Sequence, residues 1–406
     1  MTSSMGWREV RIGSLGRVVT GKTPPSARRE LFGDAHPFIT PTDIDGVSRT
    51  VATERFIADA GAAAFKNQMI PAGAVCFVCI GATIGKMCIA TRRSLTNQQV
   101  NSIVVDEALH DPKYVFYALR QIAPDVKGLA GGAATPIISK SSFSDISIRV
   151  PPLWQQRRIA FILSTYDDLI ENNTRRIAIL GEMARRIYEE WFVRFRFPGH
   201  EAVRMVESEL GLVPEGWELT SLGAVAENHD RFRRPLSKME REDFKGPYPY
   251  YGAAKIFDYV REYLFDGQFL LLAEDGSVET PDGNPVLQLT DGKFWANNHT
   301  HILRGTQRAS TEFLYLRLER QPIRGYVTGA AQPKLTQSAI NRIPLALPPC
   351  DVLRDFNALV QPIFQLRATL LRATSNLRTT RDLLLPKLIS GELDVSALPE
   401  PETVAA

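Results

Sequence analysis

The sequence lacks the features that mark secreted or membrane proteins. It has only four cysteines in 406 residues, and they fit no disulfide framework. The first residues, MTSSMGWREV, lack the basic flank and apolar core of a signal peptide. The most apolar stretch, residues 72–90, is interrupted by Gly81, Gly85 and Lys86, which predicts two buried β-strands around a glycine turn rather than a membrane span. We therefore expect a protein of the reducing cytoplasm.

A metal-binding cysteine cluster is not expected either. Cys76 and Cys79 form a CxxC pair, but no second pair or nearby histidine completes a tetrahedral site. Their odd separation would point the two side chains to opposite faces of a strand. We interpret both as small core residues.

The sequence also lacks a large excess of either charge, because 48 Lys and Arg residues nearly balance 45 Asp and Glu residues and leave a net charge of +3. Any contact with nucleic acid must therefore come from local basic patches. The length and the 44% hydrophobic content predict two or three domains, each with a core of its own.

What the sequence does contain is an internal repeat. Three segments return in the same order in the second half of the chain, each copy followed by a long helical pattern. The repeated pairs are GWREVRIGSLGRV (6–18) with GWELTSLGAV (216–225), TNQQVNSIVV (96–105) with ANNHTHIL (296–303), and residues 131–152 with residues 329–349.

Each helical pattern carries apolar residues at alternating steps of three and four, which predicts a coiled-coil seam. The two seams keep one offset throughout, since 360 − 163 and 388 − 191 both equal 197. They are Leu163, Tyr166, Ile170, Asn173, Ile177, Leu180, Ala184, Ile187 and Trp191, and Val360, Ile363, Arg367, Leu370, Thr374, Leu377, Arg381, Leu384 and Leu388. We predict an antiparallel helix pair that holds one globular unit at each end, and that Pro362 starts or kinks the second helix.

The globular units combine many short strands with Gly, Pro, Asn and Asp turns, and short helices are expected at Pro112–Gln121 and Thr311–Arg320. The predicted fold class is α+β, with two mixed α/β recognition domains, two long antiparallel helices and an internal pseudo-twofold repeat. We place the first domain at 1–150, the central helix at 151–200, the second domain at 201–348, the C-terminal helix at 349–395 and a disordered tail at 396–406.

The chain resembles the specificity subunits of type I restriction-modification systems. The segments at 151–173, 188–201 and 381–395 look like that family's spacer regions, and GATIGKMCIA with TNQQVNSIVV, and residues 251–278 with NNHTHIL, look like its recognition-domain framework. The resemblance implies a non-catalytic subunit that reads a split DNA target, one half-site per domain. It also implies that the helices recruit two adenine methyltransferase (modification) subunits, which carry S-adenosylmethionine, and that separate restriction subunits cut the DNA. No catalytic residue, metal or cofactor is expected on this chain.

Candidate DNA contacts are basic and hydroxyl side chains in loops, which can bind phosphates and base edges. The first domain offers Lys22, Thr23, Arg28, Arg29, Thr42 and Lys140, and the second offers Arg231, Arg233, Arg234, Lys238, Lys255 and Lys334. Solvated surface is the competing interpretation of each. The recurring Asn97, Gln98, Asn297, Asn298 and His299 rank lower, because their place in the framework favours turns.

Candidate partner contacts lie on the first long helix. Arg157, Arg158, Arg175 and Arg176 share one face, because eighteen residues make five turns, although plain solvated surface is an equal alternative. Tyr188, Trp191 and Phe192 form an aromatic cluster near the end of the helix, for which packing against a domain is the favoured interpretation over partner contact.

Two other functions stay open. GRVVTGKT, residues 16–23, satisfies the P-loop pattern of nucleotide hydrolases, but Pro24 and Pro25 oppose the helix that must follow it. A duplicated helical scaffold without a DNA role would fit the helices equally well.

Overall fold

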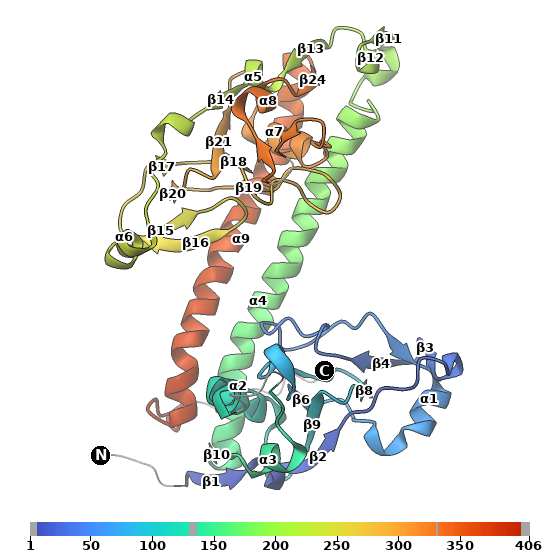
Figure 1. The fold of residues 1–406 in the computed structure, drawn as a ribbon, viewed down its shortest axis with the longest axis vertical. Coiled ribbons are helices and arrows are strands. Elements are labelled where there is room, and N and C mark those ends of the chain that lie inside the picture. Colours follow the sequence, from blue (N-terminus) through green and yellow to red (C-terminus); the bar gives the residue numbers. More distant parts are fainter. Residues whose placement is uncertain (1–5, 130–135, 330–331, 399–406) are drawn as a thin grey trace. The chain divides into compact units, whose positions relative to one another are not determined.

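The computed structural model describes residues 6–129, 136–329 and 332–398. The chain divides into two compact units (Figure 1). Unit 1 comprises Met1–Thr174 and Arg372–Ala406, and unit 2 comprises Arg175–Leu371. The two longest helices, α4 (Leu153–Tyr188) and α9 (Cys350–Ser390), each contribute one part to each unit.

Unit 1 contains two four-stranded sheets and three helices besides its parts of α4 and α9. Its elements are β1 (Arg8–Arg11), β2 (Gly16–Thr20), β3 (Phe32–Gly33), β4 (His36–Ile39), β5 (Phe56–Ile57), α1 (Asp59–Ala64), β6 (Val75–Val78), β7 (Met87–Ile89), β8 (Leu95–Thr96), β9 (Val100–Val105), α2 (Pro112–Leu129), α3 (Lys140–Asp145) and β10 (Ser147–Val150). The sheets have the strand orders β2-β9-β6-β7 and β3-β5-β4-β8, and β1 pairs with β10.

Unit 2 repeats this plan. Its elements are β11 (Met205–Ser208), β12 (Gly211–Pro214), β13 (Glu218–Ser221), α5 (Leu222–Val225), β14 (Ala226–Asn228), α6 (Lys238–Asp243), β15 (Lys245–Tyr251), β16 (Ile256–Val260), β17 (Phe265–Asp266), β18 (Leu270–Ala273), β19 (Leu287–Leu289), β20 (Lys293–Ala296), β21 (Thr300–Gly305), α7 (Thr311–Leu318), β22 (Val327–Thr328), β23 (Lys334–Leu335), α8 (Gln337–Asn341) and β24 (Pro344–Leu347). The sheet β14-β21-β18-β19 corresponds to β2-β9-β6-β7, the parallel pair β15-β20 corresponds to β4-β8, and β13-β24 corresponds to β1-β10. The predicted fold class and repeat are confirmed.

The apolar stretch of residues 72–90 folds as predicted, as β6 and β7 joined through a glycine turn. Gly81 and Gly85 have φ values of +79° and +92°, which side chains with a Cβ rarely adopt. Cys76 and Cys79 are buried in different core clusters on the two faces of β6, as their odd spacing predicted. No helix in the described part of the chain has the length and apolarity needed to cross a bilayer.

The helices α4 and α9 pair in opposite directions. In unit 1, Asp167 in the first half of α4 binds Arg381 near the end of α9. In unit 2, Phe192, in the turn that follows α4, packs on Phe356 near the start of α9, with ring centroids 4.6 Å apart. The predicted antiparallel helix pair is therefore confirmed.

Three expectations about element bounds need comment. The prediction that Pro362 starts the second long helix is wrong, because α9 begins twelve residues earlier and Pro362 lies exposed in its interior. The helix expected at 112–121 is longer than predicted, because α2 continues to Leu129. The helix expected at 311–320 is shorter, because α7 ends at Leu318. Of the tail expected to be disordered, residues 399–406 lie outside the described residues, and Ser396 is held by Arg158, which donates to its carbonyl at 2.8 Å.

The aromatic cluster at the end of α4 forms the centre of the unit 2 core. Phe356 is fully buried and contacts the rings of Phe192, Trp191 and Tyr188.

Phe356→Ala is expected to lower the free energy of unfolding by about 3–5 kcal/mol, because it removes a large buried ring. Urea denaturation followed by tryptophan fluorescence measures the loss. Leu359→Ala, on an exposed position of the same helix, is the control and is expected to change stability by less than about 0.5 kcal/mol. Equal effects of the two substitutions would contradict this account.

Candidate nucleic-acid interface

In unit 2, three loop segments meet beside the sheet β14-β21-β18-β19. They are the loop after β14, the turn before β21 and the segment that enters α8. The amide of Glu274, directly after β18, donates to the His299 carbonyl at 2.9 Å. The Glu274 carbonyl accepts from the amide of Leu335 at 2.8 Å. The backbone at Glu274 therefore fixes two of these segments to one another.

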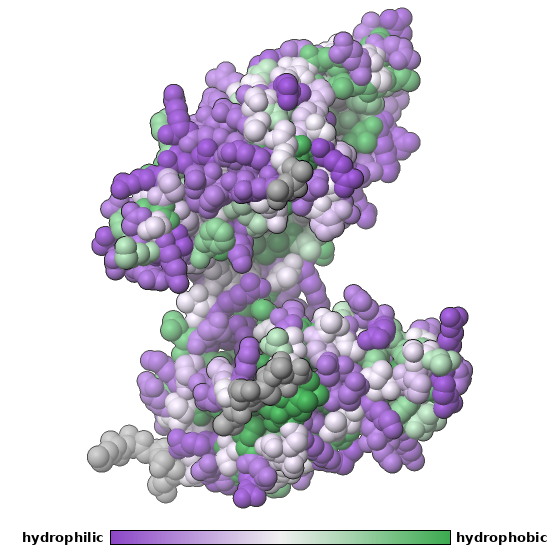
Figure 2. Space-filling model, in the orientation of Figure 1, coloured by the Kyte–Doolittle hydropathy of each residue, from purple (hydrophilic) through white to green (hydrophobic). Residues whose placement is uncertain are grey.

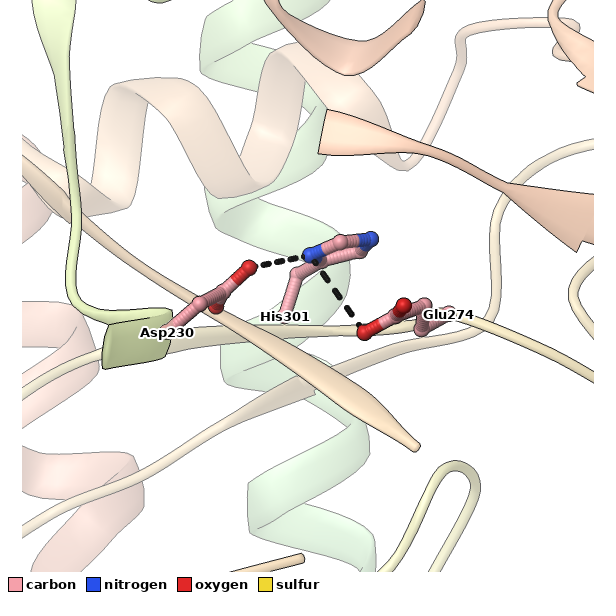
Figure 3. Close-up of side chains that lie close together, drawn as sticks. All are labelled: Asp230, Glu274 and His301. Carbon is pink, nitrogen blue, oxygen red and sulfur yellow. Dashed lines mark hydrogen bonds and ion pairs between the residues drawn. The ribbon is translucent and has the colours of Figure 1, made fainter. Parts of the chain in front are cut away.

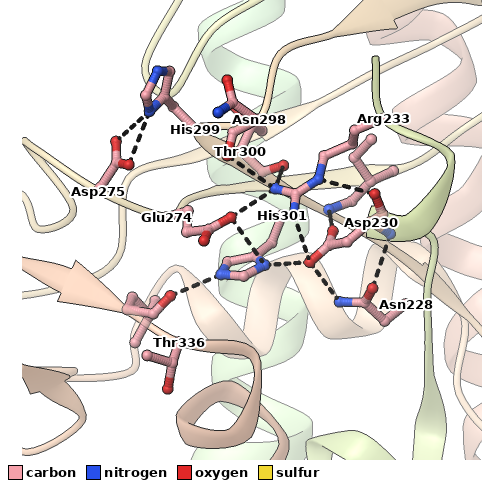
Figure 4. A network of polar contacts seen from close by, with 12 residues as sticks. Asn228, Asp230, Arg233, Glu274, Asp275, Asn298, His299, Thr300, His301 and Thr336 are labelled. Carbon is pink, nitrogen blue, oxygen red and sulfur yellow. Dashed lines mark hydrogen bonds and ion pairs between the residues drawn. The ribbon is translucent and has the colours of Figure 1, made fainter. Parts of the chain in front are cut away.

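The third segment is attached by an arginine. Arg233, in the loop after β14, donates to the carbonyls of Asn298 and Thr300 at 3.2 and 3.0 Å. Its guanidinium also binds the Glu274 carboxylate at 2.6 Å. Figure 4 shows how this side chain joins the loop to the turn and to the strand end.

Unit 1 builds the same edge with the corresponding backbone bonds. The amide of Cys79, directly after β6, donates to the Gln99 carbonyl at 2.8 Å, and the Cys79 carbonyl accepts from Ile138 at 2.9 Å. The amide of Lys22, after β2, donates to Thr96 at 2.9 Å. Three loop segments that correspond to those of unit 2 therefore meet here too.

The recurring asparagines of the two turns have a conformational role. The side-chain oxygen of Asn97 accepts from the amide of Gln99, and that of Asn297 accepts from the amide of His299, both at 3.0 Å. Each contact is an Asx turn, in which a short side chain replaces a backbone acceptor. The turn interpretation is confirmed for Asn97 and Asn297.

A buried ionic network lies beneath the unit 2 edge (Figure 3). His301 is 2% exposed, with Nδ1 2.5 Å from an Asp230 carboxylate oxygen and Nε2 2.7 Å from the Leu335 carbonyl oxygen. Carboxylate and carbonyl oxygens only accept hydrogen bonds, so both ring nitrogens must donate. His301 is therefore held as a positively charged imidazolium.

The acidic members of the network are kept ionised by their neighbours. Burial alone would raise the pKa of Asp230, but the hydrogen bond and the charge of His301 outweigh it and leave that pKa below its usual value. The pKa of Glu274 is lowered in the same way, against burial, by its hydrogen bond with Arg233 and the charge of His301. Lys334 adds a second cation, 3.2 Å from Glu274. The network therefore ties the loop, the strand end and β23 together.

Asp230, Glu274 and His301 also have the composition of a metal site, since their ligand atoms lie within 4.8 Å of one another. Two cations already neutralise the carboxylates, because Arg233 contacts both and Lys334 contacts Glu274. A metal ion would have to displace the guanidinium and face its repulsion. This residue set therefore fits a structural ion network better than a metal site.

The corresponding positions of unit 1 carry neutral residues. The strand registers place Thr20 at the position of Asp230, Asn101 at that of His301 and Cys79 at that of Glu274. Thr20 donates to the Asn101 side-chain oxygen at 2.7 Å, and the Asn101 amide approaches the Cys79 sulfur at 3.2 Å. The sequence reasoning missed both networks, although the repeat of TNQQVN in ANNHTH already aligns Asn101 with His301.

Among the predicted DNA contacts of unit 1, Lys22 and Thr23 bind residues of this edge. Lys22, Thr23, Arg28 and Arg29 are exposed in the loop after β2, where the Thr23 hydroxyl donates to Gln98 at 2.5 Å. Arg28 pairs with Glu30 at 2.8 Å on the surface. Thr42 is exposed after β4 and its hydroxyl lies 2.8 Å from that of Thr40. Lys140 is exposed at the first position of α3.

In unit 2 the predicted contacts separate into two groups. Arg233 and Lys334 are engaged in the ionic network. The other four side chains are exposed. They are Arg231 and Arg234 in the loop after β14, Lys238 at the start of α6 and Lys255 in the turn between β15 and β16. Within the part of the chain that the structure describes, the guanidinium groups of Arg231 and Arg234 have no carboxylate within 4.0 Å. The face of unit 2 drawn in Figure 2 is mainly hydrophilic around the sheet β14-β21-β18-β19.

The predicted partner contacts on α4 differ in exposure. Arg157, Arg175 and Arg176 are exposed, whereas Arg158 is half-buried and donates to the carbonyls of Val395 and Ser396. Tyr188, Trp191 and Phe192 lie in the unit 2 core, which is the packing role that the sequence favoured for them. Their burial argues against direct contact with a partner.

The P-loop geometry is absent from residues 16–23, all of which the structure describes. The amides of Gly21 and Lys22 already donate to the carbonyls of Val100 and Thr96, so they cannot surround a phosphate. The chain continues after Thr23 as a loop to a short 3-10 turn, Arg29–Leu31, and no helix begins at the threonine. A nucleotide hydrolase is therefore not supported at this position.

Comparison with known proteins identifies the family. A family profile described as "Type I restriction modification DNA specificity domain" matches residues 5–180 and 214–352, one match for each half of the repeat. The chain belongs to this family. The specificity subunit of the type I restriction enzyme MjaIX from Methanocaldococcus jannaschii is 28% identical over 410 residues, covering 97% of this chain and 94% of that protein. A putative type I specificity subunit from Haemophilus influenzae is 38% identical over 135 residues, or 33% of this chain and 34% of that protein.

A solved structure shares the fold of these specificity domains. The type I restriction-modification S subunit from M. genitalium has a TM-score of 0.64 at 16% sequence identity and covers 96% of this chain and 97% of its own. At this identity the likeness concerns the fold alone. It agrees with two mixed α/β domains and a long helix between them.

Proposed function

We propose that this chain is the subunit that chooses the DNA sequence in a type I restriction-modification complex. Each unit would read one half of a bipartite target through the edge where its three loop segments meet. The observation that carries this proposal is the duplicated edge, with basic side chains exposed on the loop after the first sheet strand in both units. Such side chains supply phosphate affinity and can reach base edges in the major groove.

The chemistry of modification and cleavage would belong to partners. Two modification subunits, which would bind S-adenosylmethionine and methylate adenine, would be recruited through the long helices, and restriction subunits would join the complex. In unit 1, α4 exposes Trp154 and Phe161 seven residues apart on one face, with the exposed Arg157 between them. Exposed aromatic and arginine side chains are typical anchors of protein interfaces.

Base-resolution mapping of adenine methylation in the host tests this function. Deleting the gene is expected to remove methylation from one split motif, and a plasmid copy is expected to restore it. A copy that encodes Arg231→Ala, Arg234→Ala and Lys238→Ala serves as the matched variant and is expected to restore it incompletely. A methylome unchanged by the deletion would reject the proposal and favour a helical scaffold without a DNA role.

A further inference from the structure

The helix pair contains a buried ion pair in unit 1 that unit 2 does not have. Asp167 of α4 and Arg381 of α9 are 6% and 3% exposed, with a carboxylate oxygen 2.6 Å from a guanidinium nitrogen. Tyr117 of α2 donates to the second oxygen of Asp167 at 2.5 Å, and Arg381 also binds the exposed Asp382. In this contact an acidic side chain of α4 meets a basic side chain of the α9 seam.

The repeat identifies the corresponding residues of unit 2. An offset of 197 residues relates Asp167 to Phe364 (364 − 167) and Ala184 to Arg381 (381 − 184). Phe364 and Ala184 are 4% and 1% exposed and belong to the same core cluster. Tyr117 is the sixth residue of α2, and the sixth residue of α7 is the buried Leu316. An ionic layer in one unit is therefore an apolar layer in the other.

Other layers of the helix pair follow the same offset and are apolar in both units. Ile159, Leu163 and Leu388 lie in the unit 1 core, and their equivalents Phe356, Val360 and Trp191 lie in the unit 2 core. Because the seams are in phase, α4 of one copy could pair with α4 of a second copy, and α9 with α9. These apolar layers differ in size but not in polarity, whereas at the ionic layer such pairing would bury a charge without its partner.

We propose that the Asp167–Arg381 ion pair selects the pairing of α4 with α9 and rejects the pairing of either helix with its copy in a second chain. In a pair of α4 helices, each Asp167 would face Ala184 and lose its guanidinium. In a pair of α9 helices, each Arg381 would face Phe364. A buried charge without its partner is strongly unfavourable, whereas the matched pair is tolerated. The ion pair thereby keeps the two halves of one chain together.

The experiment compares full-length variants by co-expressing a tagged and an untagged copy and measuring the untagged copy that copurifies. Asp167→Phe with Arg381→Ala gives unit 1 the apolar layer of unit 2. Ala184→Arg with Phe364→Asp instead gives unit 2 the ionic layer. Each double variant makes α4 and α9 equivalent at this layer. Each is therefore expected to raise the amount of untagged protein that copurifies by at least about tenfold over the wild type.

The quadruple variant that combines all four substitutions is the decisive control. It moves the ion pair to unit 2, so α4 paired with α4 is again mismatched, and copurification is expected to return to the wild-type level. Circular dichroism checks that every variant is folded. Folded double variants that copurify no more untagged copy than the wild type would overturn the proposal, as would a quadruple variant that exchanges as freely as the doubles.

Discussion

Arg231→Ala, Arg234→Ala and Lys238→Ala together are expected to weaken binding of the assembled complex to its duplex target by about 100-fold or more at moderate salt. Arg231 and Arg234 are exposed in the loop after β14, and Lys238 is exposed at the start of α6, where it lies 3.8 Å from Glu242. Within the described residues, neither arginine contacts a carboxylate. A plot of log affinity against log salt concentration has a negative slope, and each lost phosphate contact should make that slope less steep by about 0.9. Fluorescence anisotropy of a labelled duplex at several salt concentrations measures both quantities.

The matched control removes the same charge elsewhere in unit 2. Arg194, Arg196 and Arg204 are exposed but pair with glutamates, namely Glu190 and Glu215. Their replacement by alanine is expected to leave the salt slope within about one unit of the wild-type value, because they lie outside the proposed interface. If this triple variant loses as much affinity as the first, the loss reflects overall charge and not the proposed interface.

The fold followed from the sequence because its main determinant is a periodic pattern. An offset of 197 residues between two apolar seams predicts two similar units and an antiparallel helix pair, and both were found. The same pattern indicated the ionic layer, because Arg381 occupies a position of the otherwise mainly apolar α9 seam and a buried arginine requires a charged partner. Asp167 was not recognised as that partner, because the aspartate lies beside the seam and 214 residues away in the chain.

The network beneath the unit 2 edge could not be predicted from spacing. Asp230 and His301 are 71 residues apart and meet because β14 pairs with β21, and the pairing of β18 with β21 brings Glu274 to the same place. Nothing periodic in the sequence connects an aspartate in a loop to a histidine in a strand. Arg233 illustrates the consequence. The sequence suggested one more exposed cation of a basic loop, whereas its side chain is 16% exposed and its guanidinium binds Glu274.

Asp230→Ala is expected to lower the free energy of unfolding by about 3 kcal/mol, because it leaves the buried His301 imidazolium without its closest carboxylate. Asp230 has a lowered pKa, so its contribution is fully present above the pKa of an unfolded aspartate, near 3.9, and is lost as the pH falls through the folded value. The difference between wild type and variant in urea denaturation should therefore shrink as acidification protonates Asp230.

A second variant separates the charge from the space it fills. Asp230→Thr, Arg233→Thr, Glu274→Cys and His301→Asn together install the neutral residues of unit 1. These are Thr20, Thr23 (three residues after Thr20, as Arg233 is after Asp230), Cys79 and Asn101, of which Thr20 and Asn101 satisfy one another. This variant is expected to recover at least about half of the lost stability, because it leaves neither the imidazolium nor the guanidinium buried without a partner. Asp243→Ala, at an exposed position of α6, controls for the loss of a carboxylate and should change stability by less than about 0.5 kcal/mol.

Recovery by the neutral set would show that the unit 2 edge needs a satisfied polar network beneath it and not a particular charge. A stability as low as that of Asp230→Ala would show instead that the ionic network itself holds the loop.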